Sequence, residues 1–204
     1  MALLSGTITY RKYRILDEVP RDFKERMVQR LPRHCFREIN PETNPERSLG
    51  WVNPFSPLDA VLNLEKVLFG KYILLGLRKD EKRVPPPLLK ARLTEAMKHA
   101  AKDRKGRRLG RDEIAALKET VKMKALGETS PVSTFQEAVW DYETQEVYFS
   151  SQATKPNIEF SELFEETFEL ALEDQNLVVR TERNILENGL QVELDDLDAA
   201  NFAA

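Results

Sequence analysis

Apolar and polar positions alternate loosely over residues 6–15, near the start of the chain. A period of two is typical of a half-buried β-strand. The spacing then changes, because Phe23, Met27 and Leu31 lie four residues apart. This spacing places the three side chains on one face of a helix, which we expect to end at Pro32 because proline cannot continue it.

The region that follows predicts β-structure on both sides of a glycine. A short strand is expected around residues 35–36, and a proline-rich loop over 40–57. Residues 61–78 are then mostly apolar with a break near Gly70, a pattern that favours a hairpin. The second run, 72–77, is nearly continuous and is expected to form a central strand that ends at the next charge cluster.

Two helical segments follow the prolines at 85–87. The apolar face of the first is formed by Leu89, Leu93, Ala96 and Ala100. The apolar face of the second is formed by Ile114, Leu117, Val121 and Ala125. We expect Asp112 to cap the second helix and Gly127 to end it. The segment between them holds two glycines, so the region predicts a helical hairpin.

The last part of the chain returns to β-structure and then forms a helix. Residues 135–142 and 146–150 predict a second hairpin. Phe160, Phe164, Phe168 and Ala171 recur every three or four positions, which predicts a helix over 158–173 with its apolar stripe in the core. Residues 176–180 are expected to form a last strand.

The order of elements is β-α-β-β, helical hairpin, β-β-α-β. This order predicts an α+β fold, with an antiparallel core of ferredoxin-like character and an inserted two-helix hairpin. We expect residues 1–82 and 129–181 to form the core and residues 83–128 to form the hairpin. Residues 182–204 form an acidic C-terminal segment with little pattern.

Charge is unevenly distributed along the chain, although the whole has 31 Lys+Arg, 34 Asp+Glu and a net charge of -3. Residues 78–124 hold 16 Lys+Arg and 7 Asp+Glu, a surplus of nine positive charges. The remainder holds 15 and 27, a surplus of twelve negative charges. Such segregation indicates interaction surfaces that the net charge conceals.

The densest basic cluster lies at the tip of the predicted hairpin. It consists of Lys102, Arg104, Lys105, Arg107, Arg108 and Arg111. A second row follows the predicted central strand and consists of Arg78, Lys79, Lys82 and Arg83. Such clusters neutralise phosphates and bind nucleic acid without reading its sequence. The alternative is an ordinary solvated hairpin end, where charge costs nothing.

Two further functions stay open at this point. The acidic end could dock on the basic hairpin of the same or a neighbouring molecule, which would make a protein-interaction module. Asp80 and Glu81 could instead hold the metal of a nuclease. Because adjacent strand residues point to opposite faces, a mutually paired charge run is the better interpretation of these two carboxylates.

Other chemistry finds little support in the residues. His34 and His99 are isolated, and Cys35 is the only cysteine, so we expect no catalytic residue and no metal site. No phosphate-binding glycine loop occurs, and we expect no cofactor, no small-molecule substrate and no enzyme activity. The chain has neither a signal peptide pattern nor a long apolar run, so a cytoplasmic protein without membrane contact is expected.

Five short runs resemble the RdgC family of bacterial recombination-associated DNA-binding proteins. The runs are Gly50-Trp51-Val52-Asn53-Pro54, Leu74 to Lys82, Arg107 to Glu113, Lys118-Glu119-Thr120-Val121 and Trp140-Asp141. Their order and spacing match the family from about residue 6 to residue 175. The chain is shorter than family members, and most of their C-terminal base region has no counterpart here.

The resemblance implies non-sequence-specific binding of duplex DNA, which modulates recombination in the nucleoid. It also implies a homodimer, because members form a ring that encircles DNA. The family's basic, aromatic finger after the second hairpin helix is not matched, since residues 126–133 read LGETSPVS. The family is sometimes labelled an exonuclease, but these residues show no chemistry for that activity.

Overall fold

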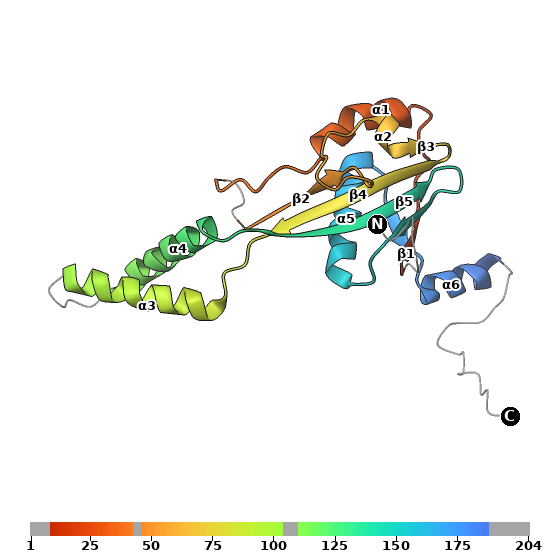
Figure 1. Cartoon of the computed structure of the whole chain (residues 1–204). Coiled ribbons are helices and arrows are strands. Elements are labelled where there is room, and N and C mark those ends of the chain that lie inside the picture. The colour runs from red at the N-terminus through yellow and green to blue at the C-terminus, as the bar shows by residue number, and fades with distance from the viewer. Residues whose placement is uncertain (1–8, 43–45, 104–109, 188–204) are drawn as a thin grey trace.

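The computed structural model describes residues 9–42, 46–103 and 110–187. It shows a mixed α+β fold with one antiparallel sheet and an arm of two helices that projects from it (Figure 1). The strands are β1 (Arg11–Ile15), β2 (Arg47–Val52), β3 (Leu68–Phe69), β4 (Tyr72–Glu81), β5 (Val132–Asp141), β6 (Glu146–Phe149) and β7 (Leu172–Asp174). The helices are α1 (Phe23–Arg30), α2 (Leu64–Val67), α3 (Pro86–Asp103), α4 (Arg111–Gly127), α5 (Thr154–Phe168) and α6 (Leu177–Glu187), with a 3-10 turn at Leu31–Arg33.

The strand order in the sheet is β2-β4-β5-β6-β1-β7, with β3 paired to β4. All of these pairs are antiparallel. Three strands separate β1 from β2, whereas a ferredoxin-like core has four strands in all and one strand between the first two. The antiparallel α+β class is confirmed, and the ferredoxin-like description stays a prediction.

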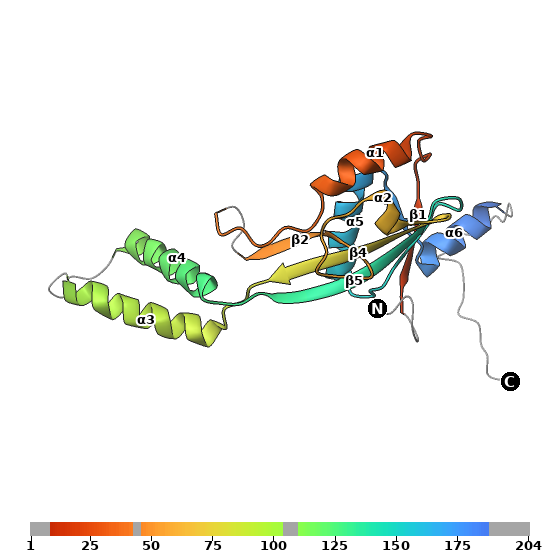
Figure 2. The ribbon, with the colours of Figure 1, turned by 45° about the horizontal axis from the view of Figure 1, so that its top comes forward.

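Helices α1 and α5 cover the same face of the sheet (Figures 1 and 2). The phenylalanine stripe of α5 lies in the core as predicted, because Phe160 and Phe164 are fully buried. The Phe160 ring stacks on Phe149 of β6, with ring centroids 4.1 Å apart. The indole of Trp51 donates a hydrogen bond to the Thr167 hydroxyl at 2.8 Å, which joins β2 to α5.

One strand lies inside the predicted proline-rich loop, so the expectation of a loop throughout 40–57 was wrong. Strand β2 pairs with β4, and its Trp51 is completely buried. The backbone N–H of Phe36 donates to the Trp51 carbonyl at 2.8 Å, so the predicted strand at 35–36 is present as a single bridge to β2. Burial of the Trp51 side chain stabilises a strand here, although the surrounding prolines predict a loop.

The predicted last strand at 176–180 was wrong as well, because these residues begin α6. The Asn176 side chain accepts a hydrogen bond from the Val179 N–H at 3.0 Å, which is typical of a helix N-cap. The last strand is β7, which begins inside the helix predicted over 158–173 and extends one residue beyond it. Helix α5 ends earlier, because Glu169 takes a left-handed conformation with φ of 57°.

Strand β4 extends through the charge cluster and ends at Glu81, four residues beyond the predicted end. It remains paired to β5 over this stretch, with Lys79 opposite Thr134 and Glu81 opposite Val132. The charged side chains at 78–81 therefore alternate between the two faces of the sheet. This alternation decides which of them are available to a ligand.

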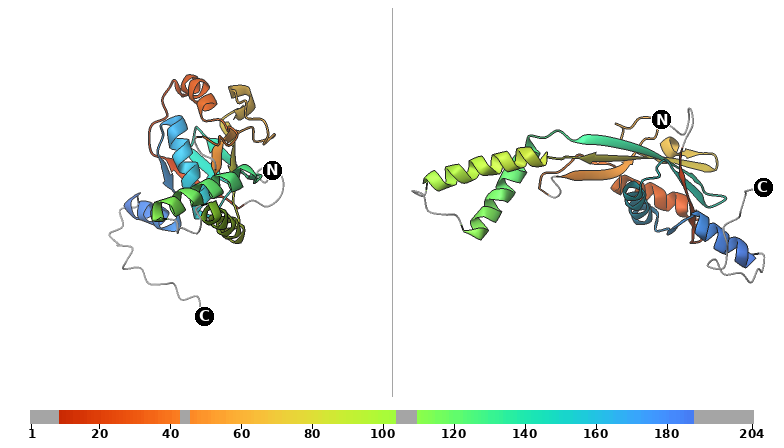
Figure 3. Two further views of the ribbon diagram at one scale, coloured as in Figure 1. Left: turned by 90° about the vertical axis from the view of Figure 1, so that its left-hand side faces the viewer. Right: turned by 90° about the horizontal axis from the view of Figure 1, so that it is seen from below.

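Helices α3 and α4 lie against each other and form the arm, which projects from the sheet (Figure 3). The residues between them, 104–109, lie outside the described part of the chain. The prediction that Asp112 caps α4 was wrong, because the N-cap is Gly110, two residues earlier, and Asp112 lies in the first turn of the helix. The Gly110 N–H donates instead to the Glu113 carboxylate at 2.9 Å. Among the described helices, none is both long enough and apolar enough to cross a membrane.

Candidate nucleic-acid interface

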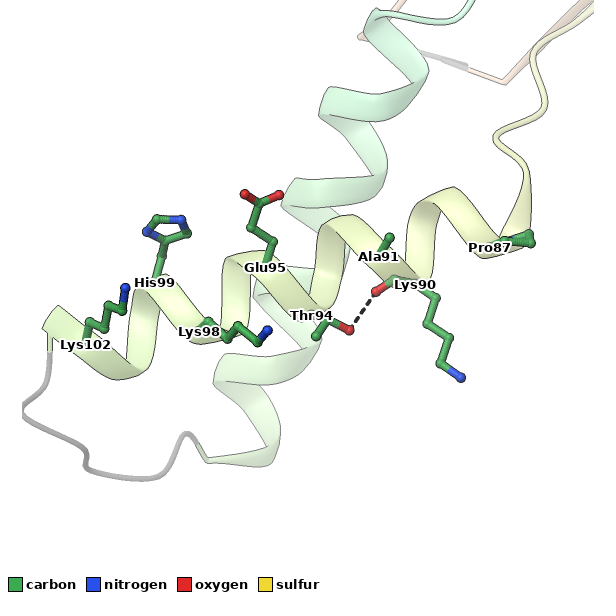
Figure 4. A pocket seen from close by; sticks show the side chains of 8 residues that line it. All are labelled: Pro87, Lys90, Ala91, Thr94, Glu95, Lys98, His99 and Lys102. Carbon is green, nitrogen blue, oxygen red and sulfur yellow. Dashed lines mark hydrogen bonds between the residues drawn. The ribbon is translucent and has the colours of Figure 1, made fainter.

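One exposed face of α3 carries a row of lysines. Lys90, Lys98 and Lys102 lie on it with Thr94 at intervals of four or eight residues; since each four-residue step turns by about 40°, they form a band that winds over about 120° of the helix surface, and Lys90 and Lys102 point in different directions (Figure 4). All four side chains are exposed, and the face borders a shallow hollow of about 720 Å³. We call these four residues the α3 lysine row.

No ion pair involves the three lysines within the residues that the structure describes. Two other cations of the arm are paired, since Arg92 lies 2.7 Å from Glu128 and Lys122 pairs with Glu46. The unpaired charge of α3 therefore faces solvent in a band that winds along the helix. Such a band concentrates positive potential where a polyanion can reach it.

The predicted tip is described only in part. Lys102 at the end of α3 and Arg111 at the start of α4 are both exposed. The four remaining predicted contacts lie outside the described residues; they are Arg104, Lys105, Arg107 and Arg108. The acidic segment 182–204 was considered as an alternative partner of the hairpin, and most of it, residues 188–204, also lies outside them.

The second basic row divides between the two faces of the sheet. Arg78 lies on the face opposite α5 and donates to both oxygens of Asp80, at 2.9 and 2.8 Å. Its guanidinium lies 4.1 Å from the centre of the Phe36 ring. Burial raises the pKa of Asp80, but the hydrogen bonds from Arg78 and Ser133 and the charge of Arg78 together outweigh it, so the pKa is lowered overall. Arg78 is therefore enclosed by structural contacts.

The other members of that row differ in how far they are available. Lys79 is 12% exposed and its ammonium lies 2.8 and 3.0 Å from the two oxygens of Glu159 in α5. The Lys82 ammonium donates to the Leu126 carbonyl at 3.1 Å, which ties β4 to the end of α4. Arg83 is 75% exposed and pairs with Glu81 at 2.9 Å. Among the four cations of this row, only Arg83 has a highly exposed side chain.

The two carboxylates considered for a nuclease are both held by cations. Asp80 is bound by Arg78, and the hydrogen bond from Arg83 lowers the pKa of Glu81. The two side chains point to opposite faces of the sheet, so they do not converge on one position. Across residues 9–42, 46–103 and 110–187, no group of three or more His, Cys, Asp or Glu side chains could hold a metal ion.

The two histidines and the cysteine occupy three different environments. Cys35 is half-buried, its thiol contacts the Leu31 carbonyl at 3.3 Å, and burial raises the pKa of the thiol. Burial also lowers the pKa of His34. His99 is exposed on α3 next to the lysine row. This arrangement gives no thiolate nucleophile paired with a base.

The sequence analysis did not predict Lys90 and Lys98 as site residues, because positive charge is densest around the two glycines between the arm helices. A signal was present in the spacing of Lys90, Thr94, Lys98 and Lys102, which recur in steps of four. A polar row with helical periodicity indicates one solvent-exposed face, in the same way that an apolar row indicates a core face.

Comparison with known proteins bears on this arrangement. A search of curated proteins found no match. The family model described as "Putative exonuclease, RdgC" matches residues 10–184, which include the sheet, the arm and α5. Because that match covers most of the chain, the protein belongs to the RdgC family.

Proposed function

We propose that the protein binds duplex DNA without sequence specificity through the α3–α4 arm, and that it modulates recombination by occupying DNA. The observation that carries this proposal is the α3 lysine row, whose three cations are exposed and unpaired within the described residues. Membership of the RdgC family supports it. The basic tip residues 104–108 continue the same charge in the sequence.

The dimensions of the row suit a phosphate backbone. Lys90 and Lys102 are twelve residues apart, which corresponds to about 18 Å along a helix that rises ~1.5 Å per residue. Over that length duplex DNA presents several phosphates, one per about 1.7 Å of axis when both strands are counted. Each cation that neutralises a phosphate releases counterions, so the affinity depends on salt.

The composition of this α3 face also argues against recognition of a base sequence. Beside the three lysines, the face carries Pro87, Ala91, Thr94, Glu95 and His99, none of which offers a broad aromatic platform like tyrosine or tryptophan. Planar side chains that can make bidentate contacts to base edges are arginine, asparagine and glutamine, and none of these lines this face. Lysines on an exposed helix contact phosphates as point charges instead.

We propose a binding protein rather than an enzyme. Asp80 and Glu81, the carboxylates best placed in sequence for a nuclease, are engaged by Arg78 and Arg83. The homodimer and the nucleoid location that the family resemblance implies are part of the same proposal. Within it, Lys102, Arg111 and the tip arginines are phosphate contacts, and Arg83 extends the contact towards the sheet.

The experiment is a duplex-binding measurement on the full chain at two salt concentrations. We expect the triple variant Lys90→Ala/Lys98→Ala/Lys102→Ala to bind more weakly. Its slope of log affinity against log salt should fall by roughly 0.9 for each phosphate that the variant no longer neutralises. The matched control removes three positive charges that lie outside the arm, in Arg14→Ala/Arg21→Ala/Lys24→Ala. Equal binding by the two triple variants would refute the assignment to α3. Single-stranded DNA, measured in parallel, tests the duplex preference.

A further inference from the structure

A second charged hollow lies at the base of the arm, on the face of the sheet that α5 covers. It has a volume of about 490 Å³. Its floor is formed by the arm-side ends of β4 and β5, and one wall is formed by the first turn of α5. The residues that carry the argument are Lys79, Glu81, Arg83, Gln136, Lys155 and Glu159. We call this hollow the β4–β5–α5 pocket.

The inner carboxylate of the pocket is neutralised by its neighbours. Glu159 is buried, and both of its oxygens are bound by the Lys79 ammonium, at 2.8 and 3.0 Å. The Arg47 guanidinium from β2 lies 3.2 Å from the same carboxylate. Glu159 therefore orients Lys79 and brings no uncompensated negative charge into the pocket.

The outer carboxylate is shared among three cations. Arg83 lies 2.9 Å from Glu81, while Lys79 and Lys155 each lie 3.9 Å from it. A separation of 3.9 Å is too long for a hydrogen bond, so Glu81 does not use the N–H donors of Lys155. Lys155 and Arg83 are 60% and 75% exposed, and both side chains can turn towards a ligand.

The pocket has a surplus of positive charge. Three cations and two carboxylates line it, so the lining has one more positive charge than negative, and Arg47 further compensates Glu159 from outside the lining. A neutral donor is present as well, because the Gln136 carboxamide lines the hollow, whereas the Thr134 hydroxyl donates to the Lys79 carbonyl at 3.4 Å. The first turn of α5 adds the positive end of its dipole. A concave, cationic surface of this kind favours an anion.

We propose that the β4–β5–α5 pocket binds a phosphate group. Lys155 and Arg83 supply the charged contacts, and the Gln136 carboxamide supplies a neutral hydrogen bond. The group is either a phosphodiester of bound DNA or a free phosphate. The DNA source rests on the proposed function, and it is favoured by position, because Arg83 lies three residues before α3 begins. A DNA strand that runs along the arm would then reach the sheet at this pocket.

The phosphate site itself is tested without DNA. Inorganic phosphate is titrated into the isotope-labelled full chain at constant ionic strength, with chloride as the reference anion, and amide shifts are followed by NMR. We expect saturable shifts at Gln136 and Lys155 with phosphate, and their loss in Lys155→Ala/Arg83→Ala. Glu81→Gln removes the competing carboxylate at nearly constant shape, so this variant should bind phosphate several-fold more tightly.

The gain in Glu81→Gln cannot be produced by a folding defect, and it keeps the test decisive if the double variant is unstable. Absence of shifts in the wild-type chain, or weaker binding by Glu81→Gln, would overturn the site. These readouts do not depend on whether the arm binds DNA.

The source of the phosphate is decided by duplex binding of the same variants. If a DNA phosphodiester occupies the pocket, the salt slope of Lys155→Ala should fall by about 0.9, as expected for one phosphate contact. The control Lys24→Ala should leave it unchanged. Phosphate-induced shifts together with an unaltered DNA slope would support a site for free phosphate and overturn the DNA source.

Discussion

Lys79 of β4 and Glu159 of α5 form an ion pair that connects the sheet to its covering helix. The two side chains are only 12% and 8% exposed, and the ammonium contacts both carboxylate oxygens. In sequence, Lys79 is one of four cations in a charged run. In the structure it holds α5 in place and forms the floor of the β4–β5–α5 pocket.

Breaking this pair should destabilise the fold. Replacement of Lys79 by methionine leaves the buried Glu159 with Arg47 alone, and we expect the free energy of unfolding to fall by about 3 kcal/mol. The double variant Lys79→Met/Glu159→Leu should recover much of that decrease, because no buried charge is left unpaired. Urea denaturation measures both. As a control, Arg26→Ala removes an exposed pair with Asp22 and should change stability far less.

Two glycines should respond to alanine in opposite ways. A Cβ at Gly50 would lie 2.8 Å from the Cys35 carbonyl carbon and closer still to the Phe36 backbone, so Gly50→Ala must displace the bridge to β2. At Gly127, the last residue of α4, a Cβ meets nothing within 4 Å. Gly127→Ala should therefore stabilise the protein by about 0.5–1 kcal/mol. Thermal unfolding of both variants checks the contrast, and equal effects would contradict it.

The sequence was sufficient where periodicity was strong. The phenylalanine stripe of α5, the hairpin of β5 and β6 and the two arm helices followed from spacing alone. The errors lie where local pattern and tertiary burial disagree. Trp51 forms a strand between prolines because its indole fills the core, and Val178-Val179 looks like a strand although Asn176 caps a helix there.

The candidate site was predictable in part for a related reason. Charge density showed where cations gather, but it could not show which of them are paired. Arg78 and Lys79 are adjacent in sequence, yet one is bound by Asp80 and the other by Glu159 from a helix 80 residues away. Only the fold separates cations that hold the structure together from those, such as Lys98, that remain available.

The stability of the sheet should depend on the ionisation of Asp141. The Lys71 ammonium, 2.8 Å away, lowers the pKa of this carboxyl, and the N–H groups of Glu143 and Thr144 lower it further. Because the folded pKa is below the unfolded one, the carboxylate stabilises the fold above an unfolded pKa of about 3.9. This contribution disappears as the pH falls through the folded pKa.

The variant Asp141→Asn tests this dependence. We expect it to be less stable than the wild type at neutral pH, and to lose less stability than the wild type between about pH 5 and pH 2. Urea denaturation at a series of pH values measures this, with Glu143→Gln at a neighbouring exposed position as the control. Parallel pH curves for Asp141→Asn and the wild type would show that the Lys71 ion pair contributes nothing.

Contact between the α3 lysine row and DNA is tested most directly by protection of lysine amines in the unmodified protein. The full chain is acetylated briefly with and without duplex DNA, at low and high salt, and modification is quantified by mass spectrometry. We predict that duplex DNA at low salt protects Lys90, Lys98 and Lys102, that high salt abolishes the protection, and that Lys24 on α1 is unaffected throughout. Unchanged modification of all three lysines under conditions in which the duplex is bound would contradict the account.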